Sequence, residues 1–506
     1  MSRTCGWMLL GAILALGGCG GGGSNTGAIQ GGGSDSNSPP PPPVTNQRGT
    51  LVGTPSLADS RSASQLTSEL DSNTYGQQVL TLAGGTMACG VDIYHVVYWT
   101  VAPATSGTGT PIEDSAALMV PTGSAAQCTG ARPIVLDGHG SMADTAFNSA
   151  NLDDDPIATM APVTQSLILA AIYASQGYIV VEPNYAGFDV STLKYHPYFN
   201  AEQNSKDMID ALAAVESALS GGLSSVTYDG KLFVSGYSEG GFVGMATDKA
   251  LQAAGETVVA TALMSGVYAM EAHYDLVFTG RAYTGVPILV TSYQNAYGNV
   301  YQSQSDIYTE QYIASPGSVG AEFNGNPLLT GNAAVDALLQ PPTSLPYDIN
   351  FGNPYRITDS YRLSYVEDVA AHPDGAVSPQ LPGAPLASAP GNALRQDLQL
   401  NDLRSWTPQM PMLLCGGHQD QNAVYEVNTQ AMATYWSAQV ASHLVTVLDV
   451  DSTPSAGDPY GAIETAFQQQ LAQNEAAMGV TAALSVYHAT VIPYCEAAAR
   501  QFFGQF

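Results

Sequence analysis

The chain has 506 residues, of which 14 are basic and 43 are acidic, so its formal net charge is −29. Binding to nucleic acid or to anionic lipid requires clustered lysine and arginine side chains, so this composition argues against both kinds of partner. Hydrophobic residues make up 45% of the chain, which is ordinary for a globular protein, and the length alone allows two to four domains.

The N-terminus has the pattern of an export signal. Arg3 precedes an apolar run over residues 7–16, and this run is shorter than the roughly 20 residues that a membrane-spanning helix needs. The run ends in Leu-Gly-Gly-Cys, which resembles the lipobox of bacterial lipoproteins and implies that Cys19 is acylated. We therefore expect a lipoprotein signal peptide over 1–18 and an exported protein of the bacterial cell envelope. It would be an outer-membrane lipoprotein or, with ordinary cleavage nearby, extracellular.

Residues 19–48 are dominated by Gly, Ser, Asn and Pro, and they include the run Pro39 to Pro43. Such a segment cannot bury a core, so we expect a flexible tether with a stiff polyproline piece.

The remaining cysteines agree with export. Apart from Cys5 in the signal and Cys19, an even number is left, which predicts two disulfides with three possible pairings. The four are Cys89, Cys128, Cys415 and Cys495. No Cys-x-x-Cys pair or His-x-x-x-His spacing indicates a metal site, and we expect no cofactor.

Strands and helices are expected to alternate from residue 91 to 264. Short β-branched or apolar runs predict strands at 91–101, 115–120, 133–136, 178–181, 231–235 and 258–264. Helical spacing predicts helices at 163–176, at 203–219 and from Glu239 to about Ala254. This alternation is typical of right-handed βαβ units and a mainly parallel sheet.

The alternation stops over residues 267–405, which are rich in Tyr, Asn, Pro and Ser and have helical patches at 286–297 and 332–340. It resumes with predicted strands at 411–414 and 443–450, a helix at 460–477 and a final helix after Pro493. We therefore predict an α/β fold with a doubly wound, mainly parallel sheet. Its core comprises 49–266 and 406–506, and a largely helical cap is inserted over 267–405.

The central motif is Gly236-x-Ser238-x-Gly240, directly after a buried strand and directly before a helix. A nucleophile elbow needs a strained strand-to-helix turn with small residues around the serine, so we expect Ser238 to be a nucleophile. The backbone N–H of Glu239 then faces a developing oxyanion, and the N–H of Ser141, after the strand at 133–136, is the expected second donor. We interpret the neighbouring His139 as structural.

The acid and the base should follow the serine in the order Ser, Asp, His. Asp420 comes a few residues after the strand at 411–414 and is the favoured acid. The alternatives are Asp402, which precedes that strand, and Asp449 and Asp451, which end the next one. His488 is the favoured base because it lies near the C-terminus, whereas His418 precedes the acid and His443 begins a strand.

These motifs resemble the secretory lipases of the α/β-hydrolase superfamily and related bacterial secreted hydrolases. The matching segments are residues 139–141, 177–187, 195–198, 236–241, 415–420, 487–488 and 493–495. The resemblance implies a Ser-Asp-His triad and a cap inserted before the strand that carries the acid. We interpret Tyr195 to Tyr198 as structural.

The predicted function is hydrolysis of a carboxylic ester through an acyl-enzyme on Ser238. The ester would be a small molecule or a lipid, and an acetylated sugar or a polyester also fits. A serine peptidase or amidase on the same fold is the alternative, since fold does not fix the substrate. A non-catalytic surface protein that has kept the fold is a second alternative.

The triad also predicts the disulfide pairing. Cys415 lies five residues before Asp420 and Cys495 seven residues after His488, so both sulfurs should lie in one neighbourhood if acid and base meet. We therefore expect Cys415 to pair with Cys495, and Cys89 to pair with Cys128.

Overall fold

The computed structural model describes residues 47–103, 109–142, 144–152, 163–280, 282, 285–314, 351, 356–377 and 384–506. The expected signal peptide, nearly all of the expected tether, Cys19 and the helical patch at 332–340 lie outside these residues. Among the described residues, no helix is both long enough and apolar enough to cross a bilayer.

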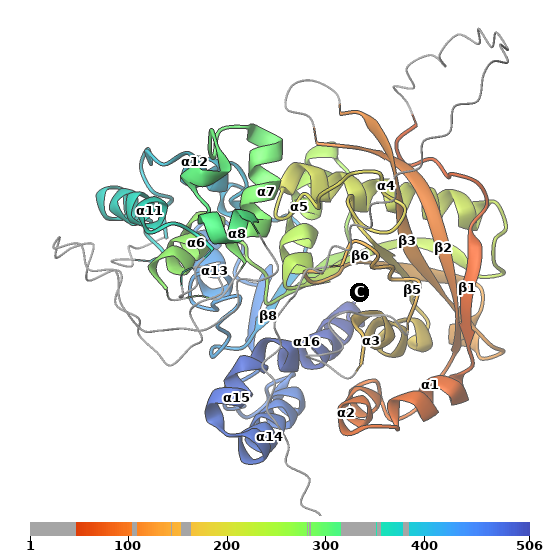
Figure 1. Ribbon diagram of the computed structural model, residues 1–506. Coiled ribbons are helices and arrows are strands. Elements are labelled where there is room, and N and C mark those ends of the chain that lie inside the picture. The colour runs from red at the N-terminus through yellow and green to blue at the C-terminus, as the bar shows by residue number, and fades with distance from the viewer. Residues whose placement is uncertain are drawn as a thin grey trace, which may run out of the picture.

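A nine-stranded sheet forms the centre of the described structure, in the order β1-β2-β3-β5-β4-β6-β7-β8-β9 (Figure 1). Its first strands pair antiparallel: β1 (Ser56–Arg61), β2 (Gly90–Val101) and β3 (Pro111–Thr122), with β3 antiparallel to β5 (Ile179–Pro183). The strands from β5 onward are parallel: β4 (Ala131–Gly138), β6 (Thr227–Tyr237), β7 (Ala260–Met264), β8 (Met412–Gly416) and β9 (Val445–Asp449). The prediction of a mainly parallel sheet is confirmed.

The central strands are apolar on both faces because helices cover both. Along β4, Ile134 and Leu136 belong to one buried cluster and Val135 belongs to the other, as the two-residue period of a strand requires. The first cluster packs against α4 (Ala201–Ser220) and α5 (Glu239–Ala254). The second packs against α1 (Ala63–Leu70), α2 (Thr74–Leu82), α3 (Gln165–Ile172), α14 (Gly461–Met478) and α16 (Tyr487–Phe503).

The segment between β7 and β8 is largely helical in its described residues, and Figure 1 shows its helices grouped beside the β8 end of the sheet. It contains α6 (Met270–Thr279), α7 (Val286–Tyr297), α8 (Glu310–Ala314), α11 (Asp359–Ala371) and α12 (Ala393–Leu400). The helical patch predicted at 286–297 coincides with α7. Helix α13 (Thr429–Trp436) follows β8, and α15 (Val480–Ser485) lies between α14 and α16. Single 3-10 turns occupy Ala126–Cys128, Ala174–Gln176, Gln304–Asp306 and Leu403–Ser405.

Two fully buried arginines form ion pairs within this segment. Arg395 on α12 pairs with Asp275 on α6 and with Asp368 on α11, both over 2.8 Å. Arg404 pairs with Asp374 over 2.7 Å and with Asp402 over 2.8 Å. Breaking a buried pair leaves an uncompensated charge, so these contacts favour one arrangement of the segment over others.

The last helix differs from the sequence prediction. It begins at Tyr487 instead of after Pro493, so Pro493 lies inside α16 and His488 lies in its first turn. Proline has no N–H to donate to the carbonyl four residues earlier, which would leave the carbonyl of Ala489 without its helical partner. The hydroxyl of Tyr75 donates to that carbonyl over 3.3 Å, so the missing hydrogen bond is replaced from α2.

Both predicted disulfides are present. Cys89 is bonded to Cys128 with a Cα–Cα distance of 5.5 Å, and Cys415 is bonded to Cys495 with a Cα–Cα distance of 5.7 Å. The second bridge joins β8 to α16, and these are the two elements next to Asp420 and His488.

Candidate active site

Ser238 stands on a strained turn between β6 and α5. Its φ is 59° and its ψ is −118°, a conformation that costs a non-glycine residue on the order of 1–3 kcal/mol. A Cβ atom at Gly236 would lie 2.1 Å from the carbonyl oxygen of Gly240, and one at Gly240 would lie 1.7 Å from that of Gly138. Both positions therefore require glycine, which is the geometry of a nucleophile elbow.

The structure brings the three predicted triad residues together. The Nε2 atom of His488 lies 2.8 Å from the Oγ atom of Ser238, and its Nδ1 atom lies 2.7 Å from the Oδ2 atom of Asp420. The other oxygen of Asp420 accepts hydrogen bonds from the N–H groups of Asn422 (2.9 Å) and Ala423 (3.1 Å). With Nδ1–H donating to this carboxylate, Nε2 is left as the acceptor for the serine hydroxyl.

The position of His488 is fixed from two sides. The hydroxyl of Tyr237, the residue before the serine, donates to the carbonyl of His488. The Cys415–Cys495 bridge is the second constraint, because it ties β8, the strand before Asp420, to α16, the helix that contains His488.

The alternative acids are engaged elsewhere. Asp402 binds the guanidinium of Arg404, and Asp449 lies 2.8 Å from Nδ1 of His418. Asp451 accepts from the hydroxyl of Tyr487 over 2.9 Å. Among the carboxylates left open by the sequence, Asp420 is therefore the one that meets His488.

The segment after β4 lies against the serine. A side chain at Gly140 would begin 3.7 Å from the Cβ atom of Ser238, and the Gly140 N–H is already bound to Oε1 of Gln165 over 2.9 Å. The next N–H, that of Ser141, donates to no acceptor among the described residues. The N–H of Glu239, the first residue of α5, also donates to no acceptor among the described residues, and it lies at the positive end of the helix.

His139 is buried, as its structural interpretation requires. Its ring nitrogens lie 2.6 Å from the carbonyl oxygen of Gly140 and 3.1 Å from that of Asn184. Burial lowers the pKa of His139 to about 4, although its two contacts with carbonyl oxygens act in the opposite direction. Within the described part of the chain, no group of three or more His, Cys, Asp or Glu side chains is arranged to hold a metal ion.

No protein-family model matches the sequence, and no curated protein matches it. Among solved structures, the chain is similar to the rice cell wall degrading esterase LipA from Xanthomonas oryzae. The TM-score is 0.59 and the identity 23%, over 85% of this chain and 98% of that one. It is also similar to a protein from Legionella pneumophila, with a TM-score of 0.60 and 19% identity over 90% of this chain and 97% of the other. The chain has the α/β-hydrolase fold. The fold that the motifs predicted from their resemblance to α/β-hydrolases is thereby confirmed.

In this α/β-hydrolase fold, one contact beside the serine could not be expected from the motifs. Nε2 of His196 lies 2.5 Å from Oε1 of Glu239, and both side chains are buried. The segment Tyr195 to Tyr198 has only a structural interpretation in the sequence, and 43 residues separate His196 from Glu239, so no spacing indicates this contact. Gln165, which binds the Gly140 N–H, was not expected either.

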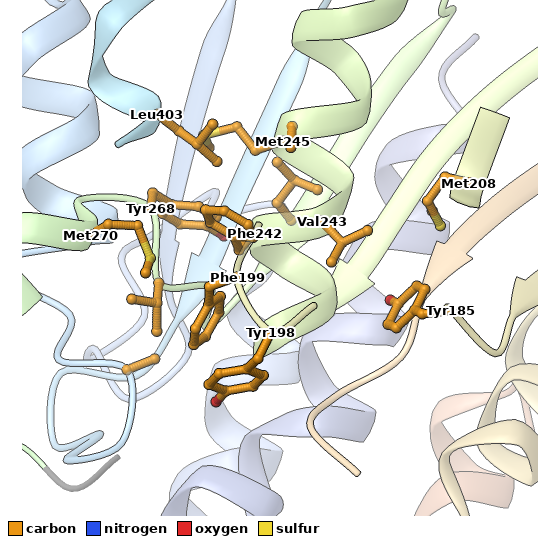
Figure 2. Packing of buried hydrophobic residues seen from close by; sticks show 14 of the residues in the cluster. Tyr185, Tyr198, Phe199, Met208, Phe242, Val243, Met245, Tyr268, Met270 and Leu403 are labelled. Atoms are coloured by element: carbon orange, nitrogen blue, oxygen red, sulfur yellow. The ribbon is translucent and has the colours of Figure 1, made fainter. Parts of the chain in front are cut away.

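The segment between β7 and β8 of the α/β-hydrolase fold approaches the site. The hydroxyl of Tyr293 on α7 donates to the carbonyl of Phe199 over 3.1 Å. Figure 2 shows Phe199 next to Phe242 of α5, with Tyr268 and Met270 beside them. Burial lowers the pKa of His273 on α6 to about 3, and the charges of Asp420 and His488 also act on this ring.

Proposed function

We propose that this protein is a serine hydrolase that cleaves carboxylic esters. The observation that supports this most strongly is the unbroken chain of contacts from Ser238 through His488 to Asp420, at 2.8 and 2.7 Å, with the serine on a strained elbow. This geometry lets one residue attack a carbonyl while a second accepts its proton and a third stabilises the resulting charge.

In the proposed reaction, Oγ of Ser238 attacks the ester carbonyl carbon while Nε2 of His488 takes the hydroxyl proton. The tetrahedral oxyanion accepts hydrogen bonds from the N–H groups of Glu239 and Ser141. The C–O bond to the alcohol then breaks, and the alcohol leaves with the proton from His488. Water repeats these steps on the acyl-enzyme, which releases the acid and restores Ser238.

Asp420 acts through His488. Its carboxylate holds the imidazole with Nδ1–H toward the acid and stabilises the imidazolium that forms during attack. Because two backbone N–H groups bind its second oxygen, the carboxylate cannot turn away from the ring. No step requires a cofactor.

Esters fit this chain better than peptides. A peptidase of this kind needs charged groups that anchor a peptide terminus, and the chain has only 14 lysines and arginines, of which Arg395 and Arg404 are buried in ion pairs. The similar structure from Xanthomonas oryzae is described as an esterase. We infer that the segment 267–405 acts as a cap and supplies apolar walls for the acyl group, and the contacts of α6 and α7 near Phe199 support this.

The proposed setting is the bacterial cell envelope. Two disulfides are typical of proteins that fold in an oxidising compartment, and the sequence before residue 47 has the pattern of a signal with Cys19 at a lipobox-like position. We propose that a lipid on Cys19 anchors the enzyme to the membrane.

Parallel assays test the substrate class. The purified protein is given p-nitrophenyl esters of increasing acyl length and aminoacyl p-nitroanilides, with Ser238→Ala as the matched control. We expect ester turnover with kcat/KM at least 100-fold above that for any anilide, and loss of both in the control. Preferred cleavage of the anilides would support the peptidase or amidase alternative and contradict the ester proposal.

A further inference from the structure

The segment Tyr195–Tyr198 contacts both residues that carry the proposed oxyanion N–H groups. His196 lies 2.5 Å from Oε1 of Glu239, and the hydroxyl of Tyr198 lies 2.9 Å from Oγ of Ser141. Glu239 begins α5 and Ser141 follows β4, so one short segment reaches two elements that are separate in the chain.

We propose that His196 and Tyr198 are positioning residues of the oxyanion hole, which hold Glu239 and Ser141 so that both N–H groups point at one oxygen. This inference rests on the proposed function. It assigns to the segment 195–198 a part in stabilising the transition state, where the sequence indicated only a structural role.

The contact of His196 has the features of a buried ion pair. Its Nε2 faces Glu239, and its Nδ1 lies 3.0 Å from the carbonyl oxygen of Ala186, so both ring nitrogens face acceptors. An imidazole satisfies two acceptors only when both nitrogens carry protons. Burial lowers the pKa of His196, but the negative charge of Glu239 and its hydrogen bond outweigh burial and raise this pKa above its ordinary value.

The burial of both side chains strengthens this pair. The His196 side chain is 4% exposed and that of Glu239 is 1% exposed, so water cannot take the place of either partner. The anchored residue carries its own backbone N–H at the first position of α5. A Glu239 side chain that is held in place restricts the backbone of the same residue, and with it the N–H donor.

Tyr198 acts on the second donor. Its ring is buried and lies against the ring of Phe199 with a centroid distance of 4.1 Å, and Figure 2 shows the two rings side by side near Phe242 of α5. The hydroxyl is thereby fixed where it meets Ser141. Gln165 binds the N–H of Gly140, and Tyr198 binds the side chain of Ser141. The residues on both sides of the Gly140–Ser141 peptide bond, which carries the Ser141 N–H, are therefore held in place.

A stack of rings joins the two contacts into one unit. The ring of Tyr185 stacks on His139 at 4.1 Å and on His196 at 5.7 Å, with interplanar angles of 24° and 17°. The hydroxyl of Tyr185 also donates to the carbonyl of His139 over 3.2 Å. The loop that contains Ser141 and the segment that holds Glu239 are therefore packed together.

Oxyanion donors act mainly in the transition state, so misplacing them should lower kcat more than it raises KM. Removing one donor outright typically lowers kcat on the order of 10²- to 10³-fold. We expect His196→Gln to lower kcat by on the order of 100-fold and Tyr198→Phe by on the order of 10-fold, with KM changed less than threefold in both.

The test measures kcat and KM for p-nitrophenyl butyrate, with each rate divided by the number of sites that a fluorophosphonate labels. It also measures Ki for a trifluoromethyl ketone, which forms a tetrahedral oxyanion on Ser238. Dividing by the number of labelled sites corrects each rate for protein that has not folded. The Ki of the ketone measures how well the oxyanion hole binds a tetrahedral oxyanion. Ki should rise in proportion to the fall in kcat/KM.

Matched controls are His95→Gln and Tyr98→Phe. His95 forms the same kind of pair with Asp189 over 2.6 Å, and the buried hydroxyl of Tyr98 donates to Asp114 over 2.9 Å, both from β2. Both controls should keep kcat and Ki within about twofold of the wild-type values. In addition, His196→Gln combined with Glu239→Gln should recover part of the loss, because it removes the unpaired buried carboxylate.

The inference is wrong if both His196→Gln and Tyr198→Phe keep the wild-type kcat per labelled site and the wild-type Ki. If the histidine variant does not fold, the result for Tyr198→Phe alone decides the test. If the inference fails, the wild type still labels and turns over esters, so the proposed function stands. A wild-type protein that neither labels nor cleaves esters would overturn both.

Discussion

Tyr487 donates a hydrogen bond to the carboxylate of Asp451 over 2.9 Å, and this contact lies beside the proposed base, since Tyr487 precedes His488. The side chain of Gln419, which precedes Asp420, donates to the same oxygen over 2.8 Å. Asp451 therefore joins the two segments that carry the acid and the base through hydrogen bonds, and it makes no contact with His488 itself.

This arrangement separates the roles of the two carboxylates. Asp420→Asn should lower kcat by on the order of 10⁴-fold, because an amide no longer holds the imidazole in the required tautomer. Asp451→Asn keeps an oxygen for Tyr487 and should lower kcat no more than about tenfold. Kinetics normalised to labelled sites measure both, and a larger loss in Asp451→Asn than in Asp420→Asn would reverse the assignment.

The disulfides should contribute unequally to stability. The Cys415–Cys495 bridge spans 80 residues and the Cys89–Cys128 bridge spans 39, so chain entropy favours the first by a few tenths of a kcal/mol out of about 4. Replacing Cys415 and Cys495 by serine should also lower kcat, since that bridge lies next to acid and base. Replacing Cys89 and Cys128 is the control and should lower stability with kcat unchanged. Denaturant unfolding and normalised kinetics together decide the matter, and an equal loss of kcat in both variants would contradict the account.

Much of the fold can be predicted because its central strands are short apolar runs between helices. The first strand could not be predicted, since β1 has the sequence Ser-Leu-Ala-Asp-Ser-Arg and lies exposed at the sheet edge, where no buried face imposes alternation. The start of α16 differs from the prediction because proline favours the first turn of a helix, whereas here Pro493 lies inside the helix and Tyr75 from α2 supplies the missing hydrogen bond.

The site, like the fold, has a part that the sequence predicts and a part that it does not. Ser238, Asp420 and His488 follow from local motifs and their order along the chain. The pair of His196 and Glu239 depends on two segments meeting in space, and neither residue has a sequence spacing that indicates a contact. Such pairs become visible only once the sheet has placed the loops.

Asp248 on α5 should make stability depend on pH. It is fully buried, and desolvation raises its pKa from 3.8 to about 8, although the nearby hydroxyl of Thr261 opposes this. An acid with a raised pKa in the folded state stabilises the fold below its unfolded pKa, and this contribution is lost as pH rises toward the folded value. The stability of the wild type should therefore fall between about pH 4 and pH 8.

In Asp248→Asn this decline should be shallower, by up to about 1.4 kcal/mol per pH unit. Unfolding by denaturant at several pH values between 5 and 8 measures the slope. Asp229→Asn, at an exposed position on β6, is the control and should keep the wild-type slope. Equal slopes in wild type and Asp248→Asn would show that the carboxyl does not titrate as stated.

Gly240→Ala should disrupt the elbow. Its Cβ atom would lie 1.7 Å from the carbonyl oxygen of Gly138, so α5 or β4 must move and the serine moves with them. We expect labelling by fluorophosphonate to slow by at least 100-fold, together with a lower melting temperature. Gly285→Ala, where the nearest atom is 3.5 Å away on Ile288, is the control and should label at the wild-type rate. Wild-type labelling of Gly240→Ala would contradict the close approach of these two segments.

The most direct test of the central claim is mass spectrometry of the protein after reaction with a fluorophosphonate. One adduct per chain is expected, on the peptide that contains Ser238. Ser238→Ala should take up no adduct, should keep the wild-type melting temperature and should lose on the order of 10⁶-fold in kcat. An adduct on another residue, or more than a few per cent of wild-type turnover in Ser238→Ala, would show that Ser238 is not the nucleophile.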